Sequence, residues 1–127
     1  MHNNPYAEKT VLVTGGTGSF GNFVVRRLLE LDAREVRVLS RDEKNQYDMR
    51  VFYQQRPDLA FIIGDVRSPA QLDEAMSGAH IVFHAAAFKQ VPACEQHPME
   101  AVRTNVLGAK NLIEAAMRHR LERFCHD

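Results

Sequence analysis

The sequence predicts a doubly wound parallel sheet with helices on both faces. Short β-branched apolar segments alternate with longer amphipathic segments along the chain, the pattern that parallel strands joined by crossover helices produce. The apolar segments are continuous runs, so the strands are expected to be buried on both faces. A glycine-rich loop joins the first strand to the first helix. With 127 residues, 45% of them hydrophobic, the chain suits one such domain with its own core.

The first strand is predicted over residues 10–14, a TVLVT run that ends abruptly at two glycines. A helix is expected from Ser19 onward, because apolar residues recur there at helical spacing and charged residues fall between them. The second strand is predicted over residues 36–39. The residues expected to pack this first helix on the sheet are Phe20, Phe23, Val24, Leu28 and Leu31.

Residues 41–56 predict a second helix that ends before Pro57, because the residue that precedes a proline avoids the α-helical region. Its sequence is strongly charged. Tyr47, Val51 and Phe52 lie together on one side of this helix.

The third and fourth strands are predicted over residues 61–63 and 81–84, and a helix lies between them. Ser68 is its expected N-cap and Pro69 its first residue, where the missing N–H of proline has no cost. This helix is expected to stop near Gly78.

A long helical pattern follows Pro92 and reaches Met117, and residues 121–125 predict the beginning of a fifth strand. The prediction for residues 1–127 is therefore a sheet of four strands, truncated near the fifth.

Composition and charge exclude several classes of function. Lys and Arg together number 16, as do Asp and Glu, so no net charge draws the chain to nucleic acid or anionic lipid. No apolar run reaches the roughly 18 residues of a membrane helix, and the polar start has no signal-peptide core, so a cytoplasmic location is expected. A basic stripe lacks interleaved aromatic residues and is predicted to be a solvated face rather than an RNA-binding surface: Arg26, Arg27, Arg34 and Arg37.

The two cysteines, Cys94 and Cys125, lie in different predicted elements and lack the spacing of paired ligands, so free thiols are predicted. Cys94 with His97, and His80 with His84, offer potential metal ligands, but no second cluster follows at a zinc spacing. No metal site and no catalytic thiol is predicted. His84 is expected to bond backbone groups at the edge of the sheet or to fill the core.

The segment 14–21, TGGTGSFG, carries the strongest functional signal. It follows a strand and opens a helix, where a glycine-rich loop binds the pyrophosphate of a dinucleotide. Gly15 is expected to take a positive φ, Gly18 to let the backbone approach the pyrophosphate, and Gly21 to pack the helix on the strand. The N–H groups of the first helical turn then face the phosphates. The sequence thus predicts a Rossmann-like, NAD(P)-binding domain whose loop contacts are Gly15, Thr17, Gly18, Ser19, Phe20 and Gly21.

The end of the second strand indicates which dinucleotide is bound. About 20 residues beyond the glycines, where a carboxylate would bind the ribose of NAD, the sequence has Ser40, Arg41 and Asp42. An arginine there pairs with the 2′-phosphate of NADP and stacks on adenine. Asp42 and a purely solvated Arg41 keep NAD open as the alternative. The sequence favours NADP, bound through Ser40 and Arg41.

These motifs resemble the extended short-chain dehydrogenase/reductase family of nucleotide-sugar enzymes. Besides the glycine loop, residues 64–67 (GDVR), 84–87 (HAAA) and 104–108 (TNVLG) match successive landmarks of that family in order. Within it, residues 40–44 (SRDEK) and 86–92 (AAFKQVP) resemble the inverting UDP-N-acetylglucosamine 4,6-dehydratases of capsule, O-antigen and glycan biosynthesis. Related 4-epimerases share most of these landmarks.

The resemblance implies further contacts with the cofactor. Asp65 and Val66 would flank adenine, with the Asp65 carboxylate accepting a hydrogen bond from the adenine amino group; capping of the next helix is the alternative role of Asp65. Lys89 would lie near the nicotinamide-side ribose, and Asn105 would join a polar network near the edge of the sheet. The residues that would let the backbone pass close to the phosphates and that ribose are Ala85, Ala86 and Ala87.

One departure from the family affects activity. The family's reaction uses a Tyr-x-x-x-Lys pair for proton transfer while NADP takes and returns a hydride, and none of the three tyrosines here is followed by a lysine four residues later. No catalytic residue is therefore predicted. The chain is expected to be the N-terminal, NADP-binding portion of a longer enzyme, without its substrate domain and inactive alone.

For that longer enzyme the resemblance implies UDP-N-acetylglucosamine as substrate, with hydride removed from C4, water eliminated across C5 and C6, and hydride returned to C6. Two alternatives stay open: a fragment of a UDP-sugar 4-epimerase, and a non-catalytic NADP-binding or sensor module. A sheet without its later strands exposes an edge, so a homo-oligomer is expected.

Overall fold

The computed structural model describes residues 6–15, 18–84 and 110–126, with the backbone alone at residues 19, 20 and 123–126. In chain order the elements are β1 (Thr10–Thr14), α1 (Ser19–Glu30), β2 (Glu35–Ser40), α2 (Glu43–Phe52), β3 (Leu59–Ile63), α3 (Pro69–Met76), β4 (Ile81–His84) and β5 (Arg123–His126). A further helical segment, called here the 110–118 helix, precedes β5.

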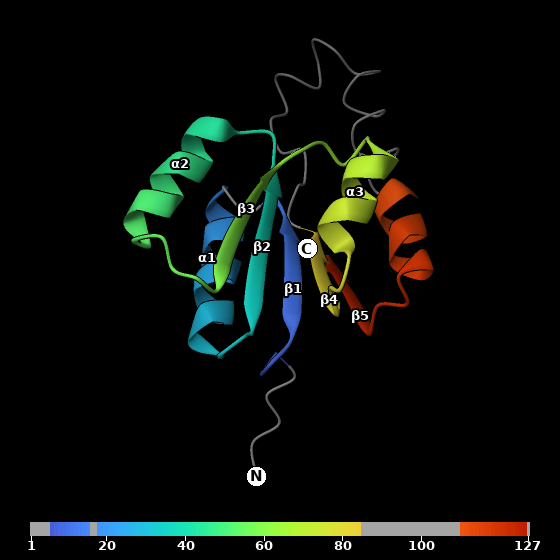
Figure 1. Cartoon of the computed structure of the whole chain (residues 1–127), viewed down its shortest axis with the longest axis horizontal. Helices are drawn as coiled ribbons and strands as arrows, with labels where there is room; N and C mark the ends of the chain where they lie inside the picture. The colour runs from blue at the N-terminus through green and yellow to red at the C-terminus, as the bar shows by residue number, and fades with distance from the viewer. Residues whose placement is uncertain (1–5, 16–17, 85–109, 127) are drawn as a thin grey trace.

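The strands form one parallel sheet of five in the order β3-β2-β1-β4-β5. Figure 1 shows α1 and α2 on one face of this sheet, and α3 with the 110–118 helix on the other. The predicted Rossmann-like, doubly wound fold is therefore confirmed. The tail predicted to begin a fifth strand is a paired neighbour of β4.

The central strand β1 connects two hydrophobic cores. Val11 and Val13 face the core formed with α1 and α2, whereas Leu12 faces the core formed with α3 and the 110–118 helix. All three side chains are completely buried. The continuous apolar run that predicted this strand thus reflects burial on both faces.

The predicted start of α1 at Ser19 is confirmed, but its packing face differs. Val24 and Leu28 are buried as expected, and so are Val25 and Leu29. Phe23, expected in the core, is 51% exposed and has the Arg26 guanidinium over its ring. The buried stripe is rotated away from Phe23.

The second helix is shorter than the predicted 41–56. It begins after its N-cap Asp42, and it ends at Phe52, because Gln54 and Gln55 take positive φ values of 56° and 55°. The boundary therefore arises from a left-handed turn well before Pro57.

The apolar side of α2 is also not its buried side. Gln46 and Met49 are its buried residues. The three apolar residues that the sequence placed on one side are 57% to 75% exposed: Tyr47, Val51 and Phe52.

The predicted start of α3 is confirmed: the Ser68 side chain caps it by accepting from the backbone N–H of Gln71, and Pro69 is its first residue. α3 ends at Met76, and Gly78 follows with a φ of 77°.

Arg37 lies beside the carboxyl end of α3, so it does not belong to the solvated basic stripe that the sequence predicted. Its guanidinium donates to the carbonyl oxygens of Ala75 and Ser77, at 2.8 and 2.5 Å.

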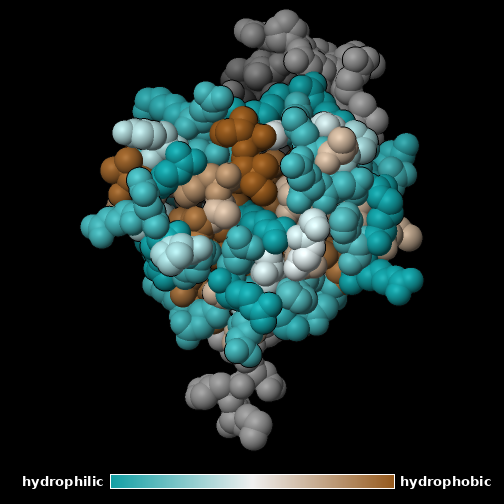
Figure 2. Space-filling model, in the orientation of Figure 1, coloured by the Kyte–Doolittle hydropathy of each residue, from teal (hydrophilic) through white to brown (hydrophobic). Residues whose placement is uncertain are grey.

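The molecular surface is mostly hydrophilic on the face in Figure 2, with an apolar patch over the carboxyl end of β3, where Ile63 is 48% exposed. No helix in the described part of the chain is long and apolar enough to cross a membrane. Within the same residues, no group of three potential ligands is placed to hold a metal ion.

Candidate functional site

The carboxyl ends of the strands meet at one edge of the sheet. The connections change direction there, because β1 lies between β2, reached through α1, and β4, reached through α3 on the opposite face. Ligands of open α/β sheets bind in the crevice at this point. The predicted site residues that the structure describes at this edge or in the turns leaving it are Gly15, Gly18, Gly21, Ser40, Arg41, Asp65 and Val66.

The structure describes the two ends of the glycine loop, Gly15 after β1 and Gly18 before α1. Gly15 has a φ of 72°, and its N–H donates to the Leu39 carbonyl oxygen on β2 at 2.9 Å. Gly18 is the N-cap of α1, has no side chain to cap the helix, and is followed by a first turn without an acidic residue. Within the described residues no side chain of the N-cap satisfies the N–H groups at this helix start, and such groups can bind an anion.

Gly18 is not required by packing against the described residues. Its φ is −79°, and among those residues a Cβ atom there would meet the Gly15 carbonyl oxygen at an ordinary 3.8 Å. Gly21 is buried in the first turn of α1. Gly15 is thus a glycine that the backbone needs, because its φ is positive.

In the turn after β2, the two charged residues Arg41 and Asp42 have different roles. Asp42 caps α2: its Oδ1 accepts from the Asn45 backbone N–H at 3.0 Å, and its Oδ2 accepts from the Asn45 side chain at 2.6 Å. Ser40 Oγ accepts from the Asp42 N–H at 2.9 Å. The Arg41 side chain is 62% exposed and reaches toward β3.

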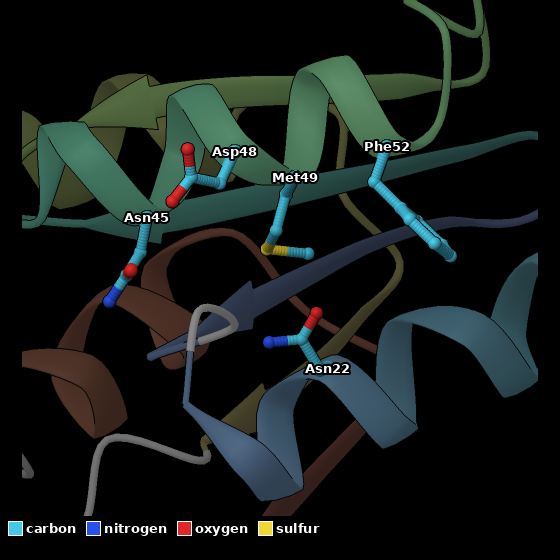
Figure 3. Close-up of a pocket in the computed structure, with 5 residues that line it drawn as sticks. All are labelled: Asn22, Asn45, Asp48, Met49 and Phe52. Carbon is cyan, nitrogen blue, oxygen red and sulfur yellow. The ribbon is translucent and has the colours of Figure 1, made fainter.

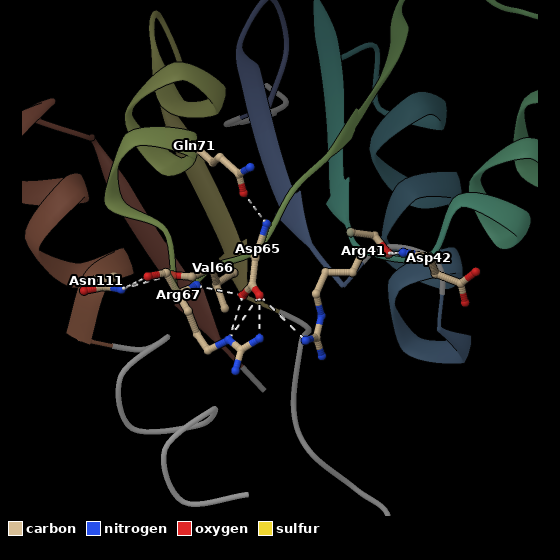
Figure 4. A network of polar contacts seen from close by, with 8 residues as sticks. Arg41, Asp42, Asp65, Val66, Arg67, Gln71 and Asn111 are labelled. Carbon is tan, nitrogen blue, oxygen red and sulfur yellow. Dashed lines mark hydrogen bonds and ion pairs between the residues drawn. The ribbon is translucent and has the colours of Figure 1, made fainter. Parts of the chain in front are cut away.

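Asp65, just after β3, binds two guanidinium groups (Figure 4). Arg67 donates from its backbone N–H to Oδ1 at 2.9 Å and from Nη2 to Oδ2 at 2.8 Å, and Arg41 Nη1 lies 3.7 Å from Oδ2. The hydrogen bonds from the Arg67 side chain lower the pKa of Asp65, and Arg41 contributes less. Asp65 is therefore an ionised carboxylate at the same edge as Arg41, and Ser68 takes the capping role of α3 instead.

Three further residues hold the turn that carries Asp65. A side chain at Gly64 would crowd this turn, because a Cβ atom would lie 2.8 Å from Leu39 Cδ1 and the buried Leu39 side chain would have to shift. Gln71 Oε1 accepts from the Asp65 N–H at 2.7 Å. Asn111, on the 110–118 helix, donates to the carbonyl oxygens of Val66 and Arg67, at 3.2 and 3.0 Å.

Sequence reasoning missed Gln71 and Asn111 as residues of this site. Gln71 sits three residues beyond a recognisable N-cap, which is a weak local signal. Asn111 is 44 residues from its partner Arg67, so only the folded chain brings the two together.

The strands β1 and β4 are joined at the crevice by a side-chain hydrogen bond. His84 Nδ1 lies 2.7 Å from the hydroxyl oxygen of the completely buried Thr14. His84 was expected to bond backbone groups or fill the core, and this contact shows it bridging the two strands at the point where the sheet connections diverge.

Several predicted contacts lie outside the described residues. These are Thr17, Ala85, Ala86, Ala87, Lys89 and Asn105, together with the potential ligands Cys94 and His97. Ser19 and Phe20 occupy the first turn of α1, where the structure describes the backbone.

A groove of about 310 Å³ opens between α1 and α2. Figure 3 shows Asn22 on α1 facing Met49 and Phe52 on α2, with Asn45 and Asp48 completing the lining. The groove adjoins the loops described above, because Asn22 Nδ2 donates to the Gly18 carbonyl oxygen at 3.0 Å and Asn45 contacts Asp42. The sequence did not predict this groove.

Comparison with known proteins adds three similar chains. A UDP-glucose 4-epimerase of Rickettsia canadensis is 53% identical over 120 residues, which are 91% of this chain and 35% of that relative. The X-ray structure of Pen from Bacillus thuringiensis matches with a TM-score of 0.91 and 36% identity over 95% of this chain and 37% of its own. DesIV, a dTDP-glucose 4,6-dehydratase from Streptomyces venezuelae solved with NAD bound, matches with a TM-score of 0.79 and 29% identity over 91% of this chain and 38% of its own.

The chain thus spans about a third of the length of the curated relatives it matches. A family model described as "Polysaccharide biosynthesis protein" matches residues 11–126, almost the whole chain. Fold, motifs and this match agree, and the chain belongs to the polysaccharide biosynthesis protein family, among the extended short-chain dehydrogenases that its motifs resemble.

Proposed function

We propose that the chain binds NADP and is the cofactor-binding part of an enzyme that modifies nucleotide sugars. The observation that carries the choice of NADP is that Asp42 and Arg41, in the turn after β2, have different roles. Both carboxylate oxygens of Asp42 cap α2, so this carboxylate is not turned toward a ribose as NAD recognition requires. Arg41 is an exposed positive charge in that turn, and a guanidinium suits a 2′-phosphate.

The glycine loop supports binding of the pyrophosphate. Gly15 turns the backbone and Gly18 leaves the uncapped start of α1 accessible. Backbone N–H groups at such a helix start bind phosphates. Ser19, Phe20 and Gly21 in the first turn of α1, with Thr17 before it, belong to the same proposed contact set.

Asp65 and Val66 are proposed to hold the adenine. The ionised Asp65 carboxylate accepts hydrogen bonds, which suits the amino group of adenine. Arg67 and Gln71 keep that carboxylate and its backbone in place. The proposed contacts on the nicotinamide side are Ala85, Ala86, Ala87, Lys89 and Asn105.

When bound, NADP would supply hydride transfer to and from a sugar carbon. The residues of this chain would bind and orient the dinucleotide, and the acid–base residues of the reaction belong to the longer enzyme.

Two reactions of the longer enzyme are compatible with these residues. The 4,6-dehydration of UDP-N-acetylglucosamine, in capsule or O-antigen biosynthesis, is proposed first because of the SRDEK and AAFKQVP segments, and the match to the dehydratase DesIV supports it. UDP-sugar 4-epimerisation is the second candidate, favoured by the name of the Rickettsia relatives. Mass spectrometry of UDP-N-acetylglucosamine incubated with the longer enzyme separates them, because dehydration loses one water and epimerisation keeps the mass.

A calorimetric titration of the chain with NADP and NAD tests the cofactor. Tighter binding of NADP is expected, and Arg41→Ala is expected to weaken NADP about tenfold while leaving NAD nearly unchanged. Arg34→Ala is the control, because Arg34 is an exposed arginine at the amino end of β2, away from the site. Equal affinity of the wild-type chain for both dinucleotides would refute the NADP assignment.

The expected homo-oligomer and cytoplasmic location are part of the same proposal. Sedimentation of the chain at two concentrations tests the first of them, and a dilution-stable monomer would contradict it.

A further inference from the structure

Gln46 is an unusual residue for the buried face of a helix. It lies on α2, is 1% exposed, and is one of three buried polar residues in the described part of the chain. Its side-chain Nε2 donates to the Ile62 carbonyl oxygen at 2.9 Å and to the Ser40 carbonyl oxygen at 3.3 Å. One side-chain amide therefore bonds the ends of both β2 and β3.

The orientation of this amide is fixed at a cost in stability. Gln46 Oε1 is buried and has no hydrogen-bond partner among the described residues. Rotating the amide by half a turn would place this oxygen against two carbonyl oxygens and leave the NH₂ group without those two acceptors. An unsatisfied buried acceptor is destabilising, so an apolar side chain such as Met would fill the position more simply. Compared with an apolar residue, glutamine at this position provides two hydrogen bonds to the ends of β2 and β3.

Those two bonds lie directly beneath the residues proposed to bind the nucleotide. Gly64 N–H donates to the Ser40 carbonyl oxygen at 3.0 Å, so Gln46 shares its acceptor with the bond that joins β3 to β2. Arg41 follows Ser40 and Asp65 follows Gly64 along the chain. The strand ends that Gln46 holds together are thus the two points from which Arg41 and Asp65 leave the sheet.

On the other face of the sheet, Gln71 of α3 accepts from the Asp65 N–H at 2.7 Å. Gln46 of α2 and Gln71 of α3 therefore hold the β3 end from opposite sides. The Arg41 guanidinium and the Asp65 carboxylate end 3.7 Å apart.

We propose that Gln46 is a positioning residue for nucleotide recognition. It fixes the separation of Arg41 and Asp65, so that Arg41 can contact the 2′-phosphate while Asp65 contacts the adenine of the same nucleotide. The inference rests on the proposed NADP site. Gln46 does not touch the nucleotide, and it acts through the Ser40 and Ile62 carbonyl groups. A ligand that uses both Arg41 and Asp65 depends on this separation more than one that uses Asp65 alone.

The test compares Gln46→Met with Met49→Ala. Both alter the buried face of α2, but only the first removes the bonds to the strand ends. For Gln46→Met we expect the Kd of NADP to rise about tenfold and that of NAD less than about threefold, the difference corresponding to a weakened charge-assisted contact. Met49→Ala is expected to lower thermal stability and leave the ratio of the two Kd values unchanged. An unchanged ratio in Gln46→Met, or an equal change in both variants, would overturn the proposal.

A second measurement does not depend on nucleotide binding. Amide hydrogen exchange by NMR on the wild-type chain should show the Gln46 side-chain NH₂ protons as the most protected of the glutamine side chains, and Gln46→Met should speed exchange at the Gly64 N–H selectively. Rapid exchange of the Gln46 NH₂ protons would refute the positioning role even if NADP binds. If the exchange results are as expected but the wild-type chain binds no dinucleotide, the proposed function is wrong. Gln46 then only holds the two strand ends together, and its role in recognition is overturned.

Discussion

Two glycines at the edge of the sheet are glycine for different reasons. A Cβ atom on Gly64 would lie 2.8 Å from Leu39 Cδ1 and 3.1 Å from Gln71 Oε1, whereas one on Gly18 would meet only an ordinary contact at 3.8 Å. A side chain at position 64 would therefore force the buried Leu39 side chain to shift. At position 18 the described residues leave space for a Cβ atom, so glycine is expected there for the approach of the proposed pyrophosphate.

Substituting alanine at each position distinguishes the packing reason at Gly64 from the ligand reason at Gly18. Gly64→Ala is expected to lower the free energy of unfolding by about 1–3 kcal/mol through overpacking. Gly18→Ala is expected to change it by less than about 1 kcal/mol while weakening NADP binding. Urea unfolding and calorimetric titration measure the two effects. A Gly18→Ala chain that binds NADP as tightly as the wild type would show that no phosphate approaches the loop at position 18.

The Asp65–Arg67 pair makes stability depend on pH in the acid range. The pKa of Asp65 is below its ordinary value in the folded chain, chiefly because of hydrogen bonds from Arg67. A carboxyl whose pKa is lowered by folding stabilises the folded state above its unfolded pKa, and this stabilisation is lost as the pH falls through the folded pKa. The loss therefore occurs below about pH 4.

Asp65→Asn tests this dependence. The wild-type chain is expected to be more stable than the variant by about 1 kcal/mol at pH 7, and this advantage should shrink as the pH falls below about 4. Urea unfolding of both chains between pH 3 and pH 7 gives the measurement. A stability difference that is the same at both ends of this range would mean that the ion pair contributes nothing.

At the scale of elements, α2 depends on Asp42 for its start. Asp42→Ala is expected to lower the free energy of unfolding by about 1 kcal/mol, because the N–H of Asn45 loses its acceptor. Asp42→Ser keeps a capping oxygen and is the matched control. Neither change should reduce the preference for NADP over NAD, because Asp42 faces the helix. A preference that shifts toward NADP in both variants would show that the carboxylate also repels the 2′-phosphate.

Elements defined by local signals were predicted well from the sequence. The β1 run, the glycine loop and the Ser68–Pro69 start of α3 all depend on neighbours in the sequence. The end of α2 was predicted wrongly because two consecutive non-glycine residues, Gln54 and Gln55, adopt left-handed backbone, which few sequence patterns indicate.

The predicted site shows the same limit. The sequence placed Arg41 and Asp65 at the ends of neighbouring strands, and the parallel sheet brings them to 3.7 Å. The partners that hold them come from α2, α3 and the 110–118 helix, through Gln46, Gln71 and Asn111. A buried glutamine on a helix interrupts the apolar pattern, and its partners here are main-chain oxygens, which no side-chain pattern reveals.

In the whole molecule, β1 belongs to both cores, so the two faces of the sheet are expected to unfold together. Val13 belongs to the same core as Leu28 of α1, and Leu12 belongs to the same core as Leu72 of α3. Leu28 is 2% exposed and Leu72 is completely buried. Leu28→Ala and Leu72→Ala are each expected to lower the free energy of unfolding by about 2–5 kcal/mol through a cavity in one core. Loss of either core removes one side of the shared strand.

Two signals distinguish joint from separate unfolding of the faces. The chain has no tryptophan, and Tyr6 and Tyr53 pack against the core of α1 and α2, so tyrosine fluorescence reports mainly on that face. Far-UV circular dichroism reports on all helices and strands. In Leu72→Ala, whose cavity lies in the opposite core, the urea midpoints of both signals are expected to fall together, because a two-state chain loses all its structure in one transition. A fluorescence midpoint that stays at the wild-type value while the dichroism midpoint falls would show instead that α1 and α2 keep their core after the other face has unfolded.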